Sequence, residues 1–193
     1  MKTAIFGGAF NPIHKGHISL ALTLKEKIGA HRVIFIPSNI SPHKSSEHLV
    51  SGEDRLKMAE LAVEGYEGFE VSDLEIRKKD VSYTFETLRL LKERYPDDEL
   101  FLFVGADMYM TLDSWRNADE IMQSVTVCTV PRDDVDKDRL TNKKREYDLR
   151  GAKSIIADMP LTDISSSEIR RGEKSEFLDE KVLKYINEHG LYL

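Results

Sequence analysis

Short runs of consecutive apolar residues alternate along the chain with segments in which apolar residues recur every three or four positions. The runs predict buried strands and the longer spacing predicts helices. We expect strands over 2–6, 33–36, 69–71, 100–104, 125–130 and 155–156. We expect helices over 17–28, 51–63, 84–91 and 115–122, and two more that begin at Ser165 and Asp179, the last ending at Gly190. This alternation predicts an α/β fold with a doubly wound, mostly parallel sheet.

The segment 132–150 departs from this pattern, because 13 of its 19 residues are charged. The simpler interpretation is an exposed helix or a solvated insertion, and the alternative is a surface that binds a partner protein. A length of 193 residues fits a single domain over 1–193. A domain of this size can bury a core without disulfides or a structural metal.

Composition narrows the class of protein. Cys128 is the single cysteine, so an internal disulfide is impossible and a reducing, cytoplasmic compartment is expected. The longest apolar run, 100–104, is far shorter than a membrane helix requires, so we expect no membrane association. The net charge of −6 argues against a general nucleic-acid binder, which needs a basic face, but it does not exclude small anionic ligands.

Three common signatures are absent from the sequence. It contains no G-x-x-x-x-G-K-[ST] phosphate loop, no G-x-G-x-x-G after the first predicted strand and no G-x-S-x-G nucleophile elbow. A ligand at the predicted sheet must therefore be bound by another arrangement.

The first candidate site is the segment Gly7–His17, which reads G-G-A-F-N-P-I-H-K-G-H and joins the first strand to the first helix. Ligands of open parallel sheets bind at such strand ends. Gly7 and Gly8 allow the backbone to approach a ligand closely, and His14 and His17 lie three residues apart at a helix start, where anions are favoured. Two alternatives are a zinc site begun by the two histidines, for which no further Cys/His cluster is present, and a histidine that is part of the core.

The second candidate site is Ser165–Arg171. Ser165 and Glu168 form the pattern of a capping box, which by itself indicates a helix start. The hydroxyls of Ser166 and Ser167, the free N–H groups of the helix start and the guanidinium of Arg170 or Arg171 would together suit a phosphate group.

These two segments together resemble the nucleotidyltransferase superfamily with the H-x-G-H signature, whose second motif here reads I-S-S-S-E-I-R from Ile164 to Arg170. The resemblance implies a Rossmann-like nucleotidyltransferase topology and catalytic roles for His14, His17 and Arg170. It implies that ATP contacts residues of both motifs and of a third segment, G-A-D: Gly7, Gly8, Ala9, Phe10, His14, His17, Gly105, Asp107, Ile164, Ser165, Ser166 and Arg170.

Further motifs resemble the bacterial nicotinate mononucleotide adenylyltransferases: P-H-K ending at Lys44, S-Y-T ending at Thr84, and Trp115. The resemblance implies substrate contacts by Asn11, Lys44, Tyr83, Thr84, Met108 and Trp115. Each motif residue also has a simpler interpretation, namely a solvated loop lysine for Lys44, a helix cap for Thr84 and for Asp107, and a core residue for Trp115. Trp115 would otherwise stack on the pyridine ring, and Asp107 would accept a hydrogen bond from a ribose.

Three positions differ from the usual pattern of this family. Ala9 stands where Thr or Ser is common, Asn11 where Asp is common, and Ser167 where Thr is common. Ala9 lacks a hydroxyl near the phosphates, so a small effect on rate is expected.

The resemblance implies adenylyl transfer from ATP to nicotinate mononucleotide, giving deamido-NAD and pyrophosphate in NAD biosynthesis. Mg²⁺ would be held by the substrate phosphates and water, without a dedicated protein site. The alternatives are transfer to another phosphate such as phosphopantetheine, a nucleotide sensor without turnover, and a partner-binding protein marked by 132–150. The degree of preference for nicotinate over nicotinamide stays open, as does assembly into a homo-oligomer.

Overall fold

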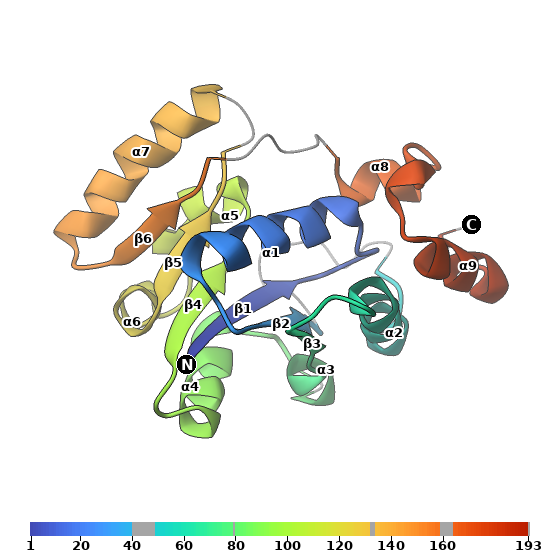
Figure 1. Ribbon diagram of the computed structural model, residues 1–193, viewed down its shortest axis with the longest axis horizontal. Coiled ribbons are helices and arrows are strands. Elements are labelled where there is room, and N and C mark those ends of the chain that lie inside the picture. The colour runs from blue at the N-terminus through green and yellow to red at the C-terminus, as the bar shows by residue number, and fades with distance from the viewer. Residues whose placement is uncertain (40–48, 79, 132–133, 159–163, 193) are drawn as a thin grey trace.

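The first strand lies in the middle of a parallel sheet. The computed structural model describes residues 1–39, 49–78, 80–131, 134–158 and 164–192. The sheet has the order β3-β2-β1-β4-β5-β6, and neighbouring strands are parallel throughout. Its strands are β1 (Lys2–Gly8), β2 (Arg32–Pro37), β3 (Phe69–Val71), β4 (Glu99–Phe103), β5 (Thr126–Thr129) and β6 (Lys153–Ile156). The predicted α/β fold with a doubly wound, parallel sheet is confirmed (Figure 1).

Alternate residues of β1 enter different cores, which explains its unbroken apolar run. Ala4 and Phe6 belong to the core on one face of the sheet, and Ile5 belongs to the core on the other. Phe6 pairs in register with Phe35 of β2 and Phe103 of β4, and all three rings are buried in the first core. A strand that is covered on both faces needs apolar side chains at every position.

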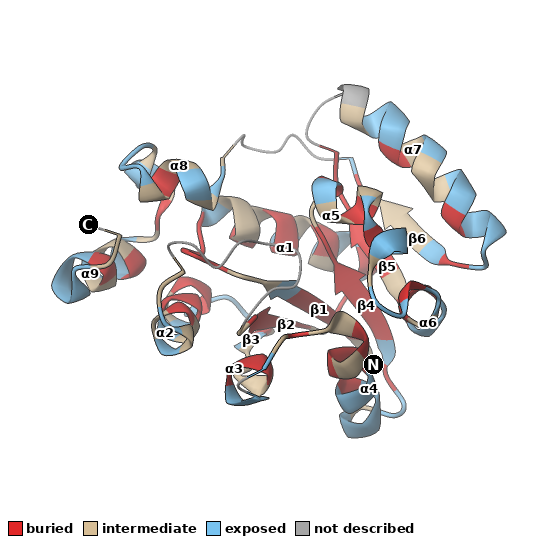
Figure 2. Ribbon diagram, turned by 180° about the vertical axis from the view of Figure 1, so that it is seen from behind, coloured by how far each residue is buried: buried red, intermediate tan, exposed pale blue. Residues whose placement is uncertain are grey.

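Helices cover both faces of the sheet (Figures 1 and 2). The first face packs against α1 (Lys15–Ile28), α2 (Gly52–Val63), α8 (Ser166–Arg170) and α9 (Glu180–His189). The second face packs against α3 (Leu74–Lys78), α4 (Thr84–Arg94), α5 (Ala106–Met110), α6 (Ala118–Ser124) and α7 (Asp134–Leu149). Two 3₁₀ turns, Leu112–Ser114 and Ser175–Phe177, complete the described elements. Within the described ranges, no helix combines the length and the apolar character needed to cross a membrane.

Several helix boundaries differ from the sequence prediction. The first helix begins at Lys15 rather than at 17, because His14 takes the extended conformation of an N-cap. The helix predicted over 115–122 begins only at Ala118, because Trp115 is extended and Asn117 is left-handed, with φ +56°. The five-residue helices α3 and α5 were not predicted, since one turn and a half carries too few apolar positions to show a period.

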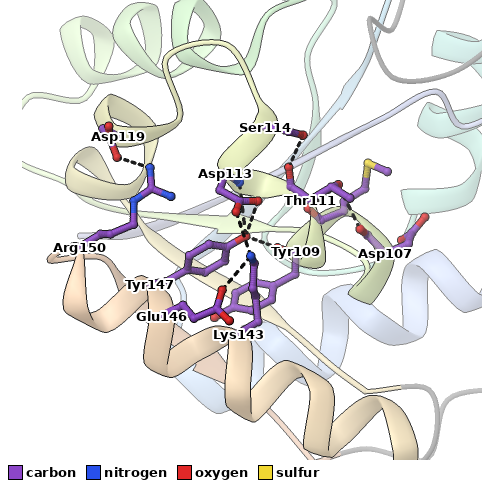
Figure 3. Close-up of polar contacts among 11 residues, drawn as sticks. Asp107, Tyr109, Thr111, Asp113, Ser114, Asp119, Lys143, Glu146, Tyr147 and Arg150 are labelled. Carbon is purple, nitrogen blue, oxygen red and sulfur yellow. Dashed lines mark hydrogen bonds and ion pairs between the residues drawn. The ribbon is translucent and has the colours of Figure 1, made fainter.

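The charged segment forms the long helix α7, most of whose described side chains face solvent (Figure 2). Leu140 and Tyr147 are nevertheless buried in the core of the second face. The Tyr147 hydroxyl donates to the backbone carbonyl of Tyr109 in α5 at 2.8 Å, and the Lys143 ammonium lies 2.8 Å from Asp113 Oδ2 (Figure 3). The helix is therefore anchored along one stripe to α5 and to the 3₁₀ turn that follows it.

Candidate active site

A pocket lies at the carboxyl ends of β1 and β4. At this point the chain stops adding strands on one side of β1 and begins to add them on the other. Strands β1 and β4 are neighbours in the sheet although β2 and β3 lie between them in sequence, and ligands of open α/β sheets bind at such a point. The pocket walls come from residues that follow three strands and from the segment that begins α4. Of the residues that the sequence analysis selected, those that line it are Gly7, Gly8, Ala9, Thr84, Gly105, Met108 and Trp115.

Aromatic packing holds the loop that follows β1. Phe10 is 2% exposed although its φ of +45° is unusual for a residue other than glycine. Its ring meets the ring of Phe6 edge to face at a centroid distance of 5.5 Å, and meets that of His17 in the same way at 5.2 Å. The Asn11–Pro12 peptide bond is cis. The side chain of Phe10 thus fixes a loop whose backbone faces the pocket.

His14 and His17 form the start of α1 and lie against each other, with ring centroids 3.8 Å apart. The backbone N–H of His14 donates to Nδ1 of His17 at 3.2 Å. A ring nitrogen that accepts a hydrogen bond carries no proton, so the neutral His17 ring carries its proton on Nε2. His17 is therefore prepared to donate a hydrogen bond from Nε2.

Gly16 lets the two motifs approach each other. A Cβ atom at this position would lie 2.9 Å from Cγ2 of Ile164 and 3.0 Å from Nδ1 of His14. A Cβ at these distances would force the side chains of Ile164 and His14 to shift, so the glycine lets the start of α1 lie this close to Ile164.

Two hydrogen bonds join α8 to the loop after β1. The Ser166 hydroxyl donates to the carbonyl of Pro12 at 2.9 Å, and Arg170 Nη1 donates to the carbonyl of Asn11 at 2.7 Å. Arg170 Nη2 also donates to the Ser167 hydroxyl at 3.2 Å. The two candidate phosphate segments, which are distant in sequence, therefore form one site in the fold (Figure 1).

The start of α8 has the capping box that the sequence predicts. Ser165 Oγ accepts from the backbone N–H of Glu168 at 3.3 Å, and Glu168 Oε2 accepts from the backbone N–H of Ser165 at 2.8 Å. Hydrogen bonds from Lys174 and from Ser165 lower the pKa of Glu168 to about 2, so this carboxylate is charged at neutral pH. The hydroxyl of Ser165 is engaged in this cap. The cap fixes the start of α8 beside the loop after β1.

Asn11 is buried and its side chain contacts other parts of the protein. Its Oδ1 accepts from the Tyr192 hydroxyl at 2.7 Å and from the backbone N–H of Val50 at 3.3 Å. Burial raises the pKa of Tyr192, which keeps its hydroxyl protonated as a donor. Asn11 is not among the residues that line the pocket, so these contacts support the loop rather than present the side chain there.

The expected substrate residues divide into two groups. Thr84, Met108 and Trp115 line the pocket, whereas Tyr83 does not and instead lies under the guanidinium of Arg116 at 4.6 Å. The N-cap of α4 is Tyr83, so Thr84 is the first helical residue and not the expected cap.

Two further expectations concern residues at the edge of the site. Asp107 lies exposed in the first turn of α5, and Gly105 is the N-cap, so the capping role considered for Asp107 falls to Gly105. Lys44 lies outside the described residues.

Arg55, which is 1% exposed, is a site residue that the sequence did not predict. Its guanidinium donates to four backbone carbonyls from three segments around the site, those of Ala9 (2.8 Å), Ser38 (2.5 Å), Asn39 (3.2 Å) and Val50 (3.1 Å). The signal for it was an arginine on the same face of α2 as Met58 and Ala59, since charged residues are rarely placed on an apolar helix face.

Glu75, which is 8% exposed and lines the pocket together with Ser82 and Thr87, is another site residue that the sequence did not predict. A glutamate in a short polar segment carries no pattern that indicates burial. Among the described residues, no three His, Cys, Asp or Glu side chains lie close enough together to hold a metal ion.

The chain is similar to known proteins over nearly its whole length. The model of the family described as Cytidylyltransferase-like matches residues 5–172, a range that contains both phosphate segments. A nicotinate-nucleotide adenylyltransferase of Bacillus subtilis is 35% identical over 196 residues, covering 99% of this chain and 98% of the relative. A Clostridium tetani protein named "Probable nicotinate-nucleotide adenylyltransferase" is 36% identical with the same coverage. This chain belongs to the nicotinate-nucleotide adenylyltransferase family.

Solved structures support the fold of this nicotinate-nucleotide adenylyltransferase family member. Plasmodium falciparum nicotinic acid mononucleotide adenylyltransferase complexed with NaAD superposes with a TM-score of 0.77 at 19% identity, covering 100% of this chain and 98% of that one. At this identity the likeness concerns the fold alone, and it confirms the Rossmann-like nucleotidyltransferase topology that the two motifs implied.

Proposed function

We propose that this protein transfers the adenylyl group of ATP to nicotinate mononucleotide, with both phosphate segments acting on ATP. The 5′-phosphate oxygen of the mononucleotide forms a bond to the α-phosphorus of ATP, and the bond from that phosphorus to the bridging oxygen of pyrophosphate breaks. The products are deamido-NAD and pyrophosphate, an intermediate step of NAD biosynthesis. The observation that carries the proposal is the joining of α8, by two hydrogen bonds, to the loop after β1, whose first residue, Ala9, lines the pocket.

The attacking oxygen is already anionic, so this reaction requires no protein nucleophile and no general base. The protein contributes by placing the two phosphates in line and by stabilising the charge that develops, and such positioning alone can lower a barrier by about 7–11 kcal/mol. Phe10, Arg55 and α8 hold the loop after β1 in place through ring packing and hydrogen bonds.

His17 and Arg170 have different roles in this mechanism. Nε2 of His17 donates to the α-phosphate, since Nδ1 is occupied by the backbone N–H of His14. His14 and Arg170 contact the outer phosphates, and the N–H groups at the start of α8 add further donors. Gly7, Gly8, Ala9 and Phe10 bring backbone close to the nucleotide, and Gly105, Asp107, Ile164, Ser165 and Ser166 border it.

The pyridine end of the mononucleotide occupies the inner part of the pocket. Trp115 offers a ring for stacking, Met108 adds apolar contact, and the backbone N–H groups beside Thr84 suit a carboxylate because they stand at the start of α4. Asn11 contributes by holding the loop after β1 in place, and Tyr83 contributes by holding the segment that leads into α4. Lys44 binds the mononucleotide phosphate.

Mg²⁺ enters with ATP as part of the substrate. The described residues offer no group of three metal-binding side chains, and Mg²⁺ commonly keeps several waters while phosphate oxygens supply its other ligands. The ion neutralises charge on the phosphates. The substrates and the single, buried cysteine fit action in the cytoplasm.

Pyrophosphate release tests the proposal. The purified protein is incubated with Mg·ATP and, separately, nicotinate mononucleotide, nicotinamide mononucleotide and phosphopantetheine. We expect release with the first and much less with the second. Release with phosphopantetheine alone would overturn the substrate assignment, and ATP binding with no release in any tube would instead indicate a nucleotide sensor.

A further inference from the structure

The pocket contains a buried carboxyl group to which the proposed mechanism gives no role. Glu75 of α3 is 8% exposed, and it is the one ionisable side chain among the described residues that line the pocket. Thr84 and Trp115 line the same pocket, so Glu75 shares it with the residues assigned to the pyridine ring. A negatively charged glutamate there would oppose a ligand that carries a carboxylate.

Two hydroxyl groups hold this carboxyl in place. The Thr87 hydroxyl donates to Glu75 Oε1 at 2.6 Å, and Ser82 forms a second side-chain hydrogen bond with it. Ser82 Oγ accepts from the backbone N–H of Asn39 at 3.1 Å, which leaves its proton for the carboxyl. Glu75 of α3 is therefore bonded to Thr87 of α4 and to Ser82, and through Ser82 it is linked to Asn39, which follows β2.

The charges around Glu75 do little to favour its ionised form. Lys78 on α3 lies near it, but its ammonium forms an ion pair with Glu86 on α4, whose own charge acts in the opposite direction. Burial is the largest influence and raises the pKa of Glu75, while the hydrogen bonds from Thr87 and Ser82 lower it. The balance is a pKa above the usual range of a glutamate.

We propose that Glu75 determines specificity between a pyridine carboxylate and a pyridine carboxamide through its protonation state. As a neutral acid it donates its own proton toward the ligand carboxylate and leaves the pocket free of negative charge. As a carboxylate it repels that ligand and instead accepts a hydrogen bond from the NH₂ group of an amide. This inference rests on the proposed function, because it assumes that the pyridine ring enters this pocket.

The first test is the ratio of kcat/KM for nicotinate mononucleotide to kcat/KM for nicotinamide mononucleotide between about pH 5.5 and pH 9, a range that lies above the ordinary pKa of a glutamate. We expect the ratio to fall by about tenfold as pH rises, the size expected of one partly screened charge. In Glu75→Gln, which stays neutral, the ratio should not change with pH. Glu93→Gln removes an exposed carboxyl of α4 and should behave like the unaltered protein.

Thr87→Val supplies a second test that keeps the carboxyl and nearly the same side-chain volume. It removes a hydrogen bond that lowers the pKa of Glu75, so the fall in the ratio should move to higher pH. The KM for ATP should be unchanged in Thr87→Val, whereas a general loosening of the fold would alter it. An identical pH profile in the unaltered protein and in Glu75→Gln, or no shift in Thr87→Val, would overturn the proposal.

Infrared difference spectra separate this proposal from the proposed function, because they need no turnover. At about pH 5.5, above the ordinary pKa of a glutamate, the spectrum of the unaltered protein minus that of Glu75→Gln should contain the carbonyl stretch of a protonated carboxyl. Its absence would overturn the inference even if the protein were an active adenylyltransferase. A protein that shows the band but turns over neither mononucleotide would contradict the proposed function and leave the protonation of Glu75 supported.

Discussion

Arg170 Nη1 donates a hydrogen bond to the backbone carbonyl of Asn11 at 2.7 Å, across 159 positions of the chain. The guanidinium has further donors, one of which reaches the Ser167 hydroxyl. A single planar group thus holds the loop after β1 and presents charge at the same place. A lysine could not do both, because its ammonium is one point charge on a flexible stem.

Arg170→Lys should therefore impair catalysis although the charge is kept. We expect kcat/KM for ATP to fall about a hundredfold, which corresponds to ~2.7 kcal/mol of transition-state stabilisation. Steady-state kinetics with ATP varied would measure it. Arg171→Lys is the matched control, since Arg171 is exposed and pairs with Glu173. Equal losses in both variants would remove the special role of Arg170.

His17→Ala should lose activity by about 10²–10³-fold, the usual cost of removing a donor aimed at developing charge. Because the His17 ring is partly exposed, the fold should survive, as circular dichroism and thermal melting would show. The control is His189→Ala, which removes an exposed imidazole stacked on Tyr185. Turnover near the original rate in His17→Ala would show that the α-phosphate is stabilised by another group.

Arg55→Met should destabilise the protein, because it leaves four buried or partly buried backbone carbonyls without their donor. We expect a loss of ~3 kcal/mol in the free energy of unfolding, from the midpoint and slope of urea denaturation. Arg55→Lys should lose less. Arg77→Met, at an exposed arginine of α3, should change the stability very little. A small loss at Arg55 would mean that water replaces the guanidinium.

Asp98 should make stability depend on acid. The hydrogen bond from the Thr3 hydroxyl, with that from the Met1 amino group and the charge of Arg32, lowers the pKa of Asp98 to about 2 from an ordinary 3.8. The ionised carboxylate therefore stabilises the fold at every pH above the ordinary pKa of 3.8. This contribution is lost as the pH falls toward about 2.

Thermal melting of the unaltered protein and of Asp98→Asn would measure this dependence. The difference in Tm should be largest near neutral pH and should shrink as the pH approaches the lowered pKa. A difference that stays constant over that range would show that the carboxylate does not stabilise the fold through its charge.

The sheet was predictable because its strands are covered on both faces. A strand such as 33–36, with apolar side chains at every position, gives a signal that local sequence alone carries. The paired motifs were also predictable, since Gly16 and the capping box of Ser165 are local features. The short helices α3 and α5 were not, because five residues carry too few apolar positions to show a helical period.

The supports of the site were harder to predict. The described hydrogen bonds of the Arg55 guanidinium all go to backbone carbonyls. Any residue type supplies a backbone carbonyl, so no partner could be identified in the sequence. Glu75 and Thr87 are twelve positions apart, and their hydrogen bond depends on how α3 meets α4. The contact of Tyr192 with Asn11 spans almost the whole chain and follows from no local pattern.

The joining of α8 to the loop after β1 also bears on how the protein becomes functional during synthesis. Contacts between residues so distant in sequence form late, because the closure of a long loop costs entropy before it is rewarded. A nascent chain of which only β1 and α1 have emerged from the ribosome carries one of the two phosphate segments and lacks the other. Nucleotide binding by chains arrested at successive lengths should therefore begin only after residue 170 has emerged, and would report the moment at which the two phosphate segments join.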